Sequence, residues 1–173
     1  MSFATSVIRR RCTAQATIAT PLGALLLART ADGLAGAWFE GQKYHAGALD
    51  APQCPDDRLL RAAADQLEAY FAGRSSRFDV PLDLHGTDFQ RNVWRQLLAI
   101  VPGQTCSYLD VARRVGSPGA VRAVGAAVGK NPLSIIVPCH RVVGSGGALT
   151  GYAGGLHRKR ALLALEGHQQ ELH

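Results

Sequence analysis

"SYLDVARRVGSPGAVRAVGAAVGKNP", residues 107–132, decides the fold of the second half of the chain, because two short helical patterns flank one tight turn. In the first pattern, Ser107 stands three residues before Asp110, which is the spacing of a capping box at a helix start. Gly116 then supplies a stop signal. The stretch therefore predicts a first helix of about two turns.

The second pattern follows directly. Ser117 is predicted to cap it, Pro118 to occupy its first helical position, and Gly129 to close it. Two short helices around the turn "GSPG" make a helix-turn-helix candidate, a motif that many DNA-binding proteins use.

The predicted second helix carries little side-chain bulk. Arg122 is its one long charged residue, and it is surrounded by small residues: Ala120, Ala123, Gly125, Ala126 and Ala127. Tight packing inside the domain is one explanation. A recognition helix in the major groove usually carries long polar side chains that read base edges. The alternative is therefore the minor groove, where a side chain can wedge into the base stack.

A further helix is predicted before this motif. In "TDFQRNVWRQLLAIVPG", residues 87–103, Thr87 and Gln90 have capping-box spacing, and the helix is predicted to end before Pro102. Its apolar residues share one face: Phe89, Val93, Trp94 and Leu97. The second half is thus predicted to be mostly helical.

"IIVPCHRVVG", residues 135–144, contains Cys139, whose thiol is the most reactive candidate group in the chain. The apolar run predicts a buried strand that ends where Pro138 removes a ladder donor, which leaves Cys139 at the end of a rigid element. His140 and Arg141 beside it favour thiolate over thiol, and thiolate is the reactive form. Neighbouring side chains in a strand point to opposite faces, so direct Cys139–His140 contact requires a bend or a bridging water. A buried cysteine without a function is the competing interpretation.

The first half reads as a small sheet followed by a helix. "TAQATIATPLGALLLARTADGLAGAWFE", residues 13–40, has strand-like runs broken by turn signals and predicts an antiparallel meander. "DDRLLRAAADQLEAYFAG", residues 56–73, has the apolar spacing of a helix that stops at Gly73. "RFDVPLDLHG", residues 77–86, predicts a strand or an extended linker.

We therefore predict an α+β (α/β) chain of two domains. The first covers residues 1–84 and begins with a loose extension over residues 1–11. The second covers residues 85–168, and a tail follows at residues 169–173. With 173 residues, 47% of them hydrophobic, the chain has enough apolar side chains for a core.

The net charge of +6 is unevenly distributed, since residues 86–168 hold ten Lys and Arg against three Asp and Glu. A basic surface is the usual electrostatic footprint of a polyanion partner, although a solvated basic face is as common. The sequence has no apolar stretch of signal-peptide or membrane-spanning length, so we expect a cytoplasmic protein without a membrane partner.

The four cysteines are scattered and form no CxxC pair or close Cys/His cluster: Cys12, Cys54, Cys106 and Cys139. We expect neither a disulfide framework nor a metal site.

"NPLSIIVPCHRVVG", residues 131–144, followed by "TGYAGG" and "ALLALEG", is similar to the signature of the O6-alkylguanine-DNA alkyltransferases, also called methylated-DNA-protein-cysteine methyltransferases. "FQRNVW", "SYLDVA" and "AVRAVGAA" fall in the same order at family-like spacing. The match is strong over residues 87–166 and looser over residues 12–84. The resemblance implies an N-terminal RNase H-like domain of sheet plus helix and a C-terminal winged helix-turn-helix domain.

The resemblance implies a direct-reversal DNA repair protein. Such a protein flips O6-alkylguanine out of duplex DNA and transfers the alkyl group, mainly methyl, irreversibly to its own cysteine, here Cys139. Each molecule acts once, because the thioether product has no good leaving group. No cofactor is needed, since the lesion is the alkyl donor. The expected partner is double-stranded DNA containing O6-alkylguanine, bound by a monomer, with cooperation along the DNA left open.

The resemblance also implies roles around Cys139. Glu166 would orient His140, which would take the thiol proton through a water. Asn131 would support the turn and the hydrogen bonds around the site, and Tyr108 would assist proton transfer to the leaving guanine.

Further positions match the family's contacts to DNA and the flipped base. Arg122 matches the finger that fills the gap left in the base stack, and Tyr152 matches the aromatic residue of the loop that closes over the base. Backbone groups near Cys139 and Val142 would read the guanine edge. The remaining predicted contacts are Ser117, Ala123, Gly125, Ala126 and Arg141.

Some positions depart from the family. Many bacterial members carry asparagine where this chain has Val128, and some carry serine where it has Ala153, which bears on pocket detail and alkyl-size preference but not on the reaction class. The zinc site found in some members is not supported, because the N-terminal candidates have unmatched spacings: Cys12, Cys54, His45 and His85.

Two other functions compete with this interpretation. A thiol hydrolase would use Cys139, His140 and Glu166 for acyl transfer and would turn over steadily on esters or amides. A non-catalytic sensor of alkylated DNA would share the fold, but such proteins lack the cysteine.

Overall fold

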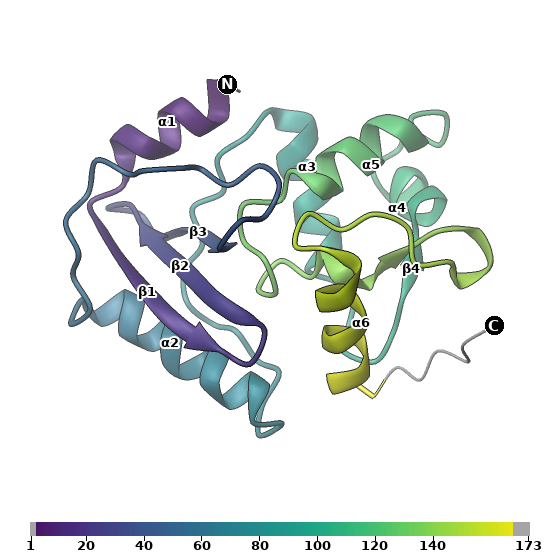
Figure 1. The fold of residues 1–173 in the computed structure, drawn as a ribbon. Coiled ribbons are helices and arrows are strands. Elements are labelled where there is room, and N and C mark those ends of the chain that lie inside the picture. Colours follow the sequence, from purple (N-terminus) through teal and green to yellow (C-terminus); the bar gives the residue numbers. More distant parts are fainter. Residues whose placement is uncertain (1–2, 168–173) are drawn as a thin grey trace. The chain divides into compact units, whose positions relative to one another are not determined.

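The computed structural model describes residues 3–167, and the predicted tail at residues 169–173 lies outside them. The chain is α+β, as predicted, and divides into two compact units on either side of the Thr87–Asp88 bond (Figure 1). Among the described residues, no helix has both the length and the apolar character needed to cross a membrane.

A three-stranded antiparallel sheet forms the centre of the first unit and confirms the predicted meander. Its strands lie in the order β1 (Ala14–Thr20), β2 (Gly23–Arg29) and β3 (Leu34–Phe39). Leu26 on the central strand pairs with Thr17 of β1 and with Trp38 of β3.

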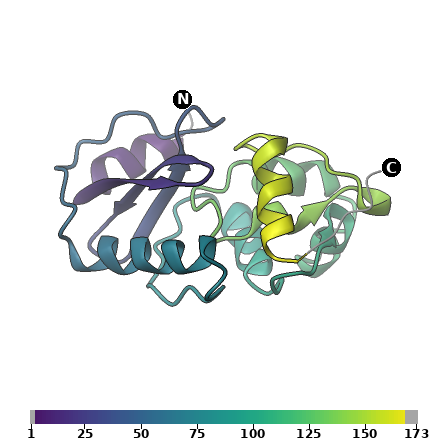
Figure 2. The ribbon, with the colours of Figure 1, turned by 60° about the horizontal axis from the view of Figure 1, so that its bottom comes forward.

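Helix α2 (Arg58–Phe71) packs on one face of this sheet and confirms the second prediction for this unit (Figure 2). Asp57 caps the helix, because its side chain accepts hydrogen bonds from the backbone N–H groups of Leu59 and Leu60. The chain leaves the helix at Gly73, whose φ of +71° lies in the left-handed region that favours glycine. The helix buries Leu60, Ala63, Leu67 and Tyr70.

The prediction of a loose extension is wrong for residues 3–11. They form helix α1 (Phe3–Arg11), and the sheet lies between α1 and α2 (Figure 2). Ile8 packs in one hydrophobic cluster with Cys12 and Trp38. All six residues of β3 are buried, as expected for a strand covered on both faces. A helix of nine residues is marginal on its own, so α1 depends on its packing against Trp38, a contact that local sequence does not reveal.

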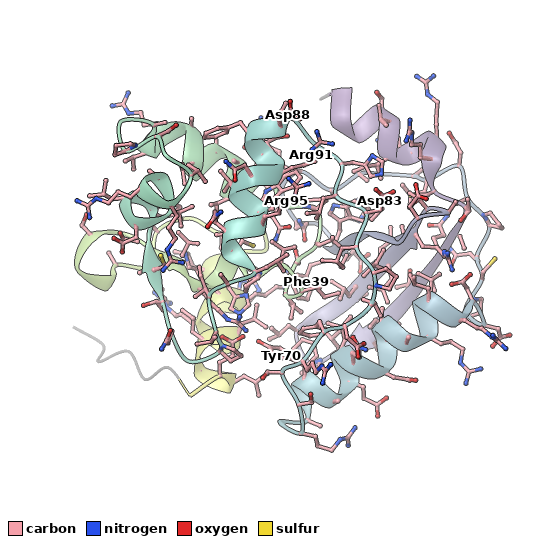
Figure 3. All side chains as sticks on the ribbon, turned by 180° about the vertical axis from the view of Figure 1, so that it is seen from behind. Phe39, Tyr70, Asp83, Asp88, Arg91 and Arg95 are labelled. Carbon is pink, nitrogen blue, oxygen red and sulfur yellow. The ribbon has the colours of Figure 1, made fainter. Side chains whose placement is uncertain are left out.

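An extended segment runs beside β3, where a strand or linker was predicted. Leu34 forms a bridge with Leu82, and its backbone N–H donates to the Pro81 carbonyl at 2.8 Å. Asp83, visible in Figure 3, accepts hydrogen bonds from the Thr30 hydroxyl at 2.5 Å and from His85 at 2.7 Å. The segment therefore covers an edge of the sheet.

The second unit is mostly helical. It contains α3 (Asp88–Leu97), α4 (Tyr108–Arg114), α5 (Val121–Gly129) and α6 (Leu156–Leu165), and two short parallel strands, β4 (Cys106–Ser107) and β5 (Val142–Val143).

Helix α3 presents its apolar face to the interior of this unit. It buries Val93, Trp94 and Leu97, and the indole N–H of Trp94 donates to the Ala127 carbonyl of α5 at 2.8 Å. Arg91 pairs with Asp88, and Arg95 follows one turn later on the same helix (Figure 3).

Helices α4 and α5 follow one another as the predicted helix-turn-helix. Ser107 and Asp110 form the expected capping box, with hydrogen bonds of 3.0 and 3.2 Å. The Ser117 N–H donates to the Ala112 carbonyl and closes the end of α4, where Gly116 has a φ of +78°.

The prediction that Ser117 caps the second helix is therefore wrong. Its backbone N–H belongs to the end of α4, and its carbonyl accepts a hydrogen bond from Ala120. This turn delays the start of α5 to Val121, three residues later than Pro118 suggested.

Residues 134–136 form a turn and Val137 a bend, instead of the predicted buried strand. The segment is buried, but Ile135 has a φ of +73°, which a strand does not allow. An apolar run indicates burial without specifying the backbone. Here the Asn131 side chain binds backbone groups of Leu133 and Val137, which partly replaces the hydrogen bonds of a strand ladder.

Candidate active site

Cys139 begins a short 3-10 helix, η1 (Cys139–Arg141), directly after Pro138. The side chain is buried, and the Val142 N–H donates to the Cys139 carbonyl at the end of the turn. Because this helix has about three residues per turn, the side chains of Cys139 and His140 do not alternate across a sheet as they would in the predicted strand.

Asn131 holds the thiol in place. Its amide nitrogen donates to Sγ of Cys139 at 3.1 Å and to the Val137 carbonyl at 2.8 Å. Its amide oxygen accepts the Leu133 N–H at 2.9 Å. A single buried amide thus fixes both the preceding turn and the sulfur atom.

Burial raises the pKa of the Cys139 thiol, because a thiolate is poorly solvated there. Four interactions lower this pKa, the largest first: the hydrogen bond from Asn131, the positive charge of Lys159, a backbone hydrogen bond at Cys139 and a hydrogen bond from the Tyr152 side chain. The net direction is upward, so the resting thiol carries its proton and needs a base before it can act as a nucleophile.

His140 is the base that the family resemblance implies. Its Nε2 lies 2.7 Å from Oε1 of Glu166, and both side chains are buried. Burial lowers the pKa of His140 despite the opposing effect of Glu166, so the imidazole is neutral. A neutral ring that donates from Nε2 has an acceptor lone pair on Nδ1. Among the described residues, the buried Nδ1 atom has no hydrogen-bond partner, which leaves it available to accept a proton.

Arg141, a predicted substrate or DNA contact, is buried in an ion pair with Glu166. It is only 5% exposed, and its guanidinium donates to Oε2 and Oε1 of Glu166 at 2.9 and 2.7 Å. It also donates to the Ile100 carbonyl at 2.5 Å. Arg141 therefore clamps the carboxylate that holds His140, a contact that local sequence does not reveal because Glu166 lies 25 residues further along the chain.

Two tyrosines belong to the same region. The Tyr108 hydroxyl donates to the Thr150 carbonyl at 3.3 Å, and a Cβ added at Gly125 would lie 3.8 Å from the Tyr108 ring. Burial raises the pKa of Tyr108, as does the negative charge that Cys139 can acquire. The Tyr152 side chain is half-buried, and its hydroxyl is buried.

Helix α5 has two distinct faces. Val124, Ala127 and Val128 are buried, whereas Arg122, Ala123 and Ala126 are exposed and Gly125 is half-buried. Tight packing thus explains the small Ala127, and the exposed face combines small residues with one arginine. Val128, one of the two departures from the family, lies in the interior. Ser117 and Ala153 are half-buried.

Sequence reasoning missed Lys159. It is completely buried in α6, and its ammonium donates to the carbonyls of Val142, Thr150 and Gly151. Nothing in the local pattern "HRKR" separates it from the half-buried or exposed basic residues around it.

Among the residues that the structure places, no group of three or more His, Cys, Asp or Glu side chains could hold a metal ion. All four cysteines are free thiols.

Two family models match the chain. Residues 14–84 match the ribonuclease-like domain of 6-O-methylguanine DNA methyltransferase, and residues 88–168 match its DNA binding domain. The methylated-DNA-protein-cysteine methyltransferase of Mycobacterium bovis is 52% identical over 150 residues, which cover 87% of this chain and 90% of that protein. Its counterpart in Methanosarcina acetivorans is 46% identical over 151 residues, 86% of this chain and 94% of that protein.

Solved structures agree with these matches. The Mycobacterium tuberculosis OGT in complex with DNA has a TM-score of 0.83 and 49% identity, over 89% of this chain and 92% of that one. An O6-methylguanine DNA methyltransferase from Methanococcus jannaschii has a TM-score of 0.64 and 26% identity, over 91% of this chain and 96% of that one. The matches extend over both units, and the chain therefore belongs to the 6-O-methylguanine DNA methyltransferase family.

Proposed function

We propose that this chain repairs DNA by transferring the alkyl group from O6 of a flipped guanine to Sγ of its own Cys139. The observation that carries this proposal is the buried thiol, held by Asn131 and adjacent in sequence to a neutral His140 that Glu166 orients. Family membership and the similarity to a relative solved in complex with DNA support the substrate class.

The transfer is a single displacement. The S–C bond forms as the C–O6 bond breaks, and the electron pair of the broken bond goes to guanine. The thiol proton passes to Nδ1 of His140 through a bridging water, and Glu166 stabilises the resulting imidazolium. Tyr108 delivers a proton to the leaving guanine, which would otherwise depart as an anion. The proton that His140 took from the thiol then replaces the one that Tyr108 gave up, so the protein ends with no net change in charge.

The product limits each molecule to one reaction. A thioether at Cys139 has no good leaving group, unlike the acyl-enzyme of a thiol hydrolase. The buried position of the sulfur also restricts access for a second nucleophile. We therefore expect stoichiometric repair without turnover.

The direct test is the intact mass of the protein after incubation with a duplex that carries one O6-methylguanine. The expected result is a gain of one methyl group, saturating at one per molecule. An unchanged mass with the lesion duplex still bound would point to a damage sensor. An unchanged mass without binding would return the thiol hydrolase as the better explanation.

Arg122, on the exposed face of α5, is proposed to fill the gap that the flipped base leaves. The Arg122→Ala variant should transfer methyl from duplex DNA about 10-fold or more slowly, because unstacking a base costs roughly a few kcal/mol. Attack on free O6-methylguanine base should be unchanged. Arg74→Ala, at an exposed position of the first unit, is the control. Equal losses on duplex and free base would refute the finger role.

We also propose that the protein acts as a monomer in the cytoplasm. The mechanism needs Cys139 as a free thiol, all four cysteines are free, and cytosolic thiols are kept reduced.

A further inference from the structure

Among the described residues, Lys159 is buried without a carboxylate partner. It is 0% exposed, although lysine is almost never fully buried unless its charge is paired. Its ammonium instead donates to three backbone carbonyls: Val142 at 2.6 Å, Thr150 at 3.0 Å and Gly151 at 3.3 Å. An ammonium has three N–H donors, so this arrangement matches its full capacity.

The three carbonyls belong to two different segments around the candidate active site. Val142 follows η1, and its N–H donates to the Cys139 carbonyl. Thr150 and Gly151 directly precede Tyr152, and the Thr150 carbonyl also accepts the Tyr108 hydroxyl at 3.3 Å. Lys159 therefore links the segment that carries the thiol to the segment that accepts the Tyr108 hydroxyl and leads into Tyr152.

Its charge also acts on the reacting groups. Burial lowers the pKa of Lys159 to about 8, so the ammonium still keeps its proton at neutral pH. In that state it lowers the pKa of Cys139, against the larger effect of burial, and it contributes to the lowered pKa of His140. Cys139 and His140 are thus the titratable groups that respond to Lys159.

We propose that Lys159 is a positioning residue for methyl transfer, whose ammonium joins residues 150–151 to Val142 and so places Tyr108 and Tyr152 relative to Cys139. This inference rests on the proposed function. A lysine that contributed only to stability could carry its charge at the protein surface. The Lys159 ammonium instead joins two segments of the site, although its burial removes the charge from water at a cost in free energy.

The test compares Lys159→Met with wild type. Methionine has a similar length but neither charge nor donors. The single-turnover rate of methyl transfer from an O6-methylguanine duplex should fall about 100-fold, because small misplacements of reacting groups have effects of this size. The Kd for the same duplex should be unchanged. Lys43→Met, at an exposed position in the first unit, should react at the wild-type rate.

The pH profile separates positioning at the site from a loss of packing. Without the ammonium, the pKa of Cys139 should rise further, so the rising limb of the rate against pH should move to higher pH in Lys159→Met. A wild-type rate with an unshifted profile would overturn the inference. Absence of methyl transfer in the wild type would instead overturn the proposed function, and with it the basis for this role.

Lys159→Arg keeps the test valid if the methionine variant does not fold. Arginine retains the charge, but its planar guanidinium is larger than the compact ammonium and cannot reproduce three converging contacts. A rate loss of about 10-fold or more at the wild-type melting temperature supports positioning. An arginine variant that folds and reacts at the wild-type rate refutes it.

Discussion

The Cys139→Ala variant is expected to gain no methyl group from an O6-methylguanine duplex and to bind that duplex as the wild type does. The substitution removes the only atom to which the proposed reaction attaches the alkyl group. The loss of one buried sulfur should cost about 1 kcal/mol of stability, comparable to a methyl-sized cavity. Asn131 keeps its hydrogen bonds to the Val137 and Leu133 carbonyls, so the turn should persist.

Cys106→Ala is the matched control. Cys106 is also buried, lies in the same unit and has a pKa raised by burial. It pairs through β4 with Val142, yet the proposed reaction does not use its thiol. This variant should take up one methyl group per molecule, whereas any uptake by Cys139→Ala would place the transfer on a different residue. Intact mass measured on both variants decides the question.

The sequence predicted those elements whose determinants are local. The capping box of α4 needs only Ser107 and Asp110, three residues apart, and it forms as expected. The strands of the first unit and helix α2 likewise follow from turn signals and apolar spacing. Helix α1 could not be predicted in this way, because its stabilising contact is with Trp38, far along the chain.

The predictions of a helix cap at Ser117 and of a buried strand before Cys139 were wrong for a related reason, because side-chain and backbone partners outside the local pattern decide both. Serine before proline is a common helix start, but here the N–H of Ser117 completes the Schellman motif of α4. The apolar run indicated burial correctly. The backbone conformation of this run depends on Asn131, whose side chain donates to the Val137 carbonyl and accepts from the Leu133 N–H.

The residues of the candidate site also differ in whether their contacts are local in the sequence. Cys139 and His140 were recognisable because they are adjacent in a distinctive motif. The ion pair of Arg141 with Glu166 spans 25 residues, and the contact of Lys159 with Val142 spans 17. No periodicity links such positions, so the sequence predicted neither the pairing of Arg141 with Glu166 nor any role for Lys159.

The Glu166→Gln variant is expected to lose both stability and methyl transfer. The Glu166 carboxylate accepts hydrogen bonds from His140 and, at both oxygens, from Arg141. Glutamine keeps the shape but replaces one acceptor with a donor and leaves the buried Arg141 without a counter-charge. Breaking a buried ion pair costs about 3–5 kcal/mol. Urea unfolding should show this loss, and Glu68→Gln, at an exposed position of α2, should not.

The single-turnover rate of Glu166→Gln should fall about 100-fold or more, which is the usual contribution of an oriented general base. Glu166 acts to raise the pKa of His140, so without the carboxylate that pKa falls further and the imidazole becomes a weaker base. Higher pH ionises Cys139 without help from His140. The ratio of wild-type to variant rates should therefore shrink as pH rises. A constant ratio would instead assign the whole loss to disturbed packing around Arg141.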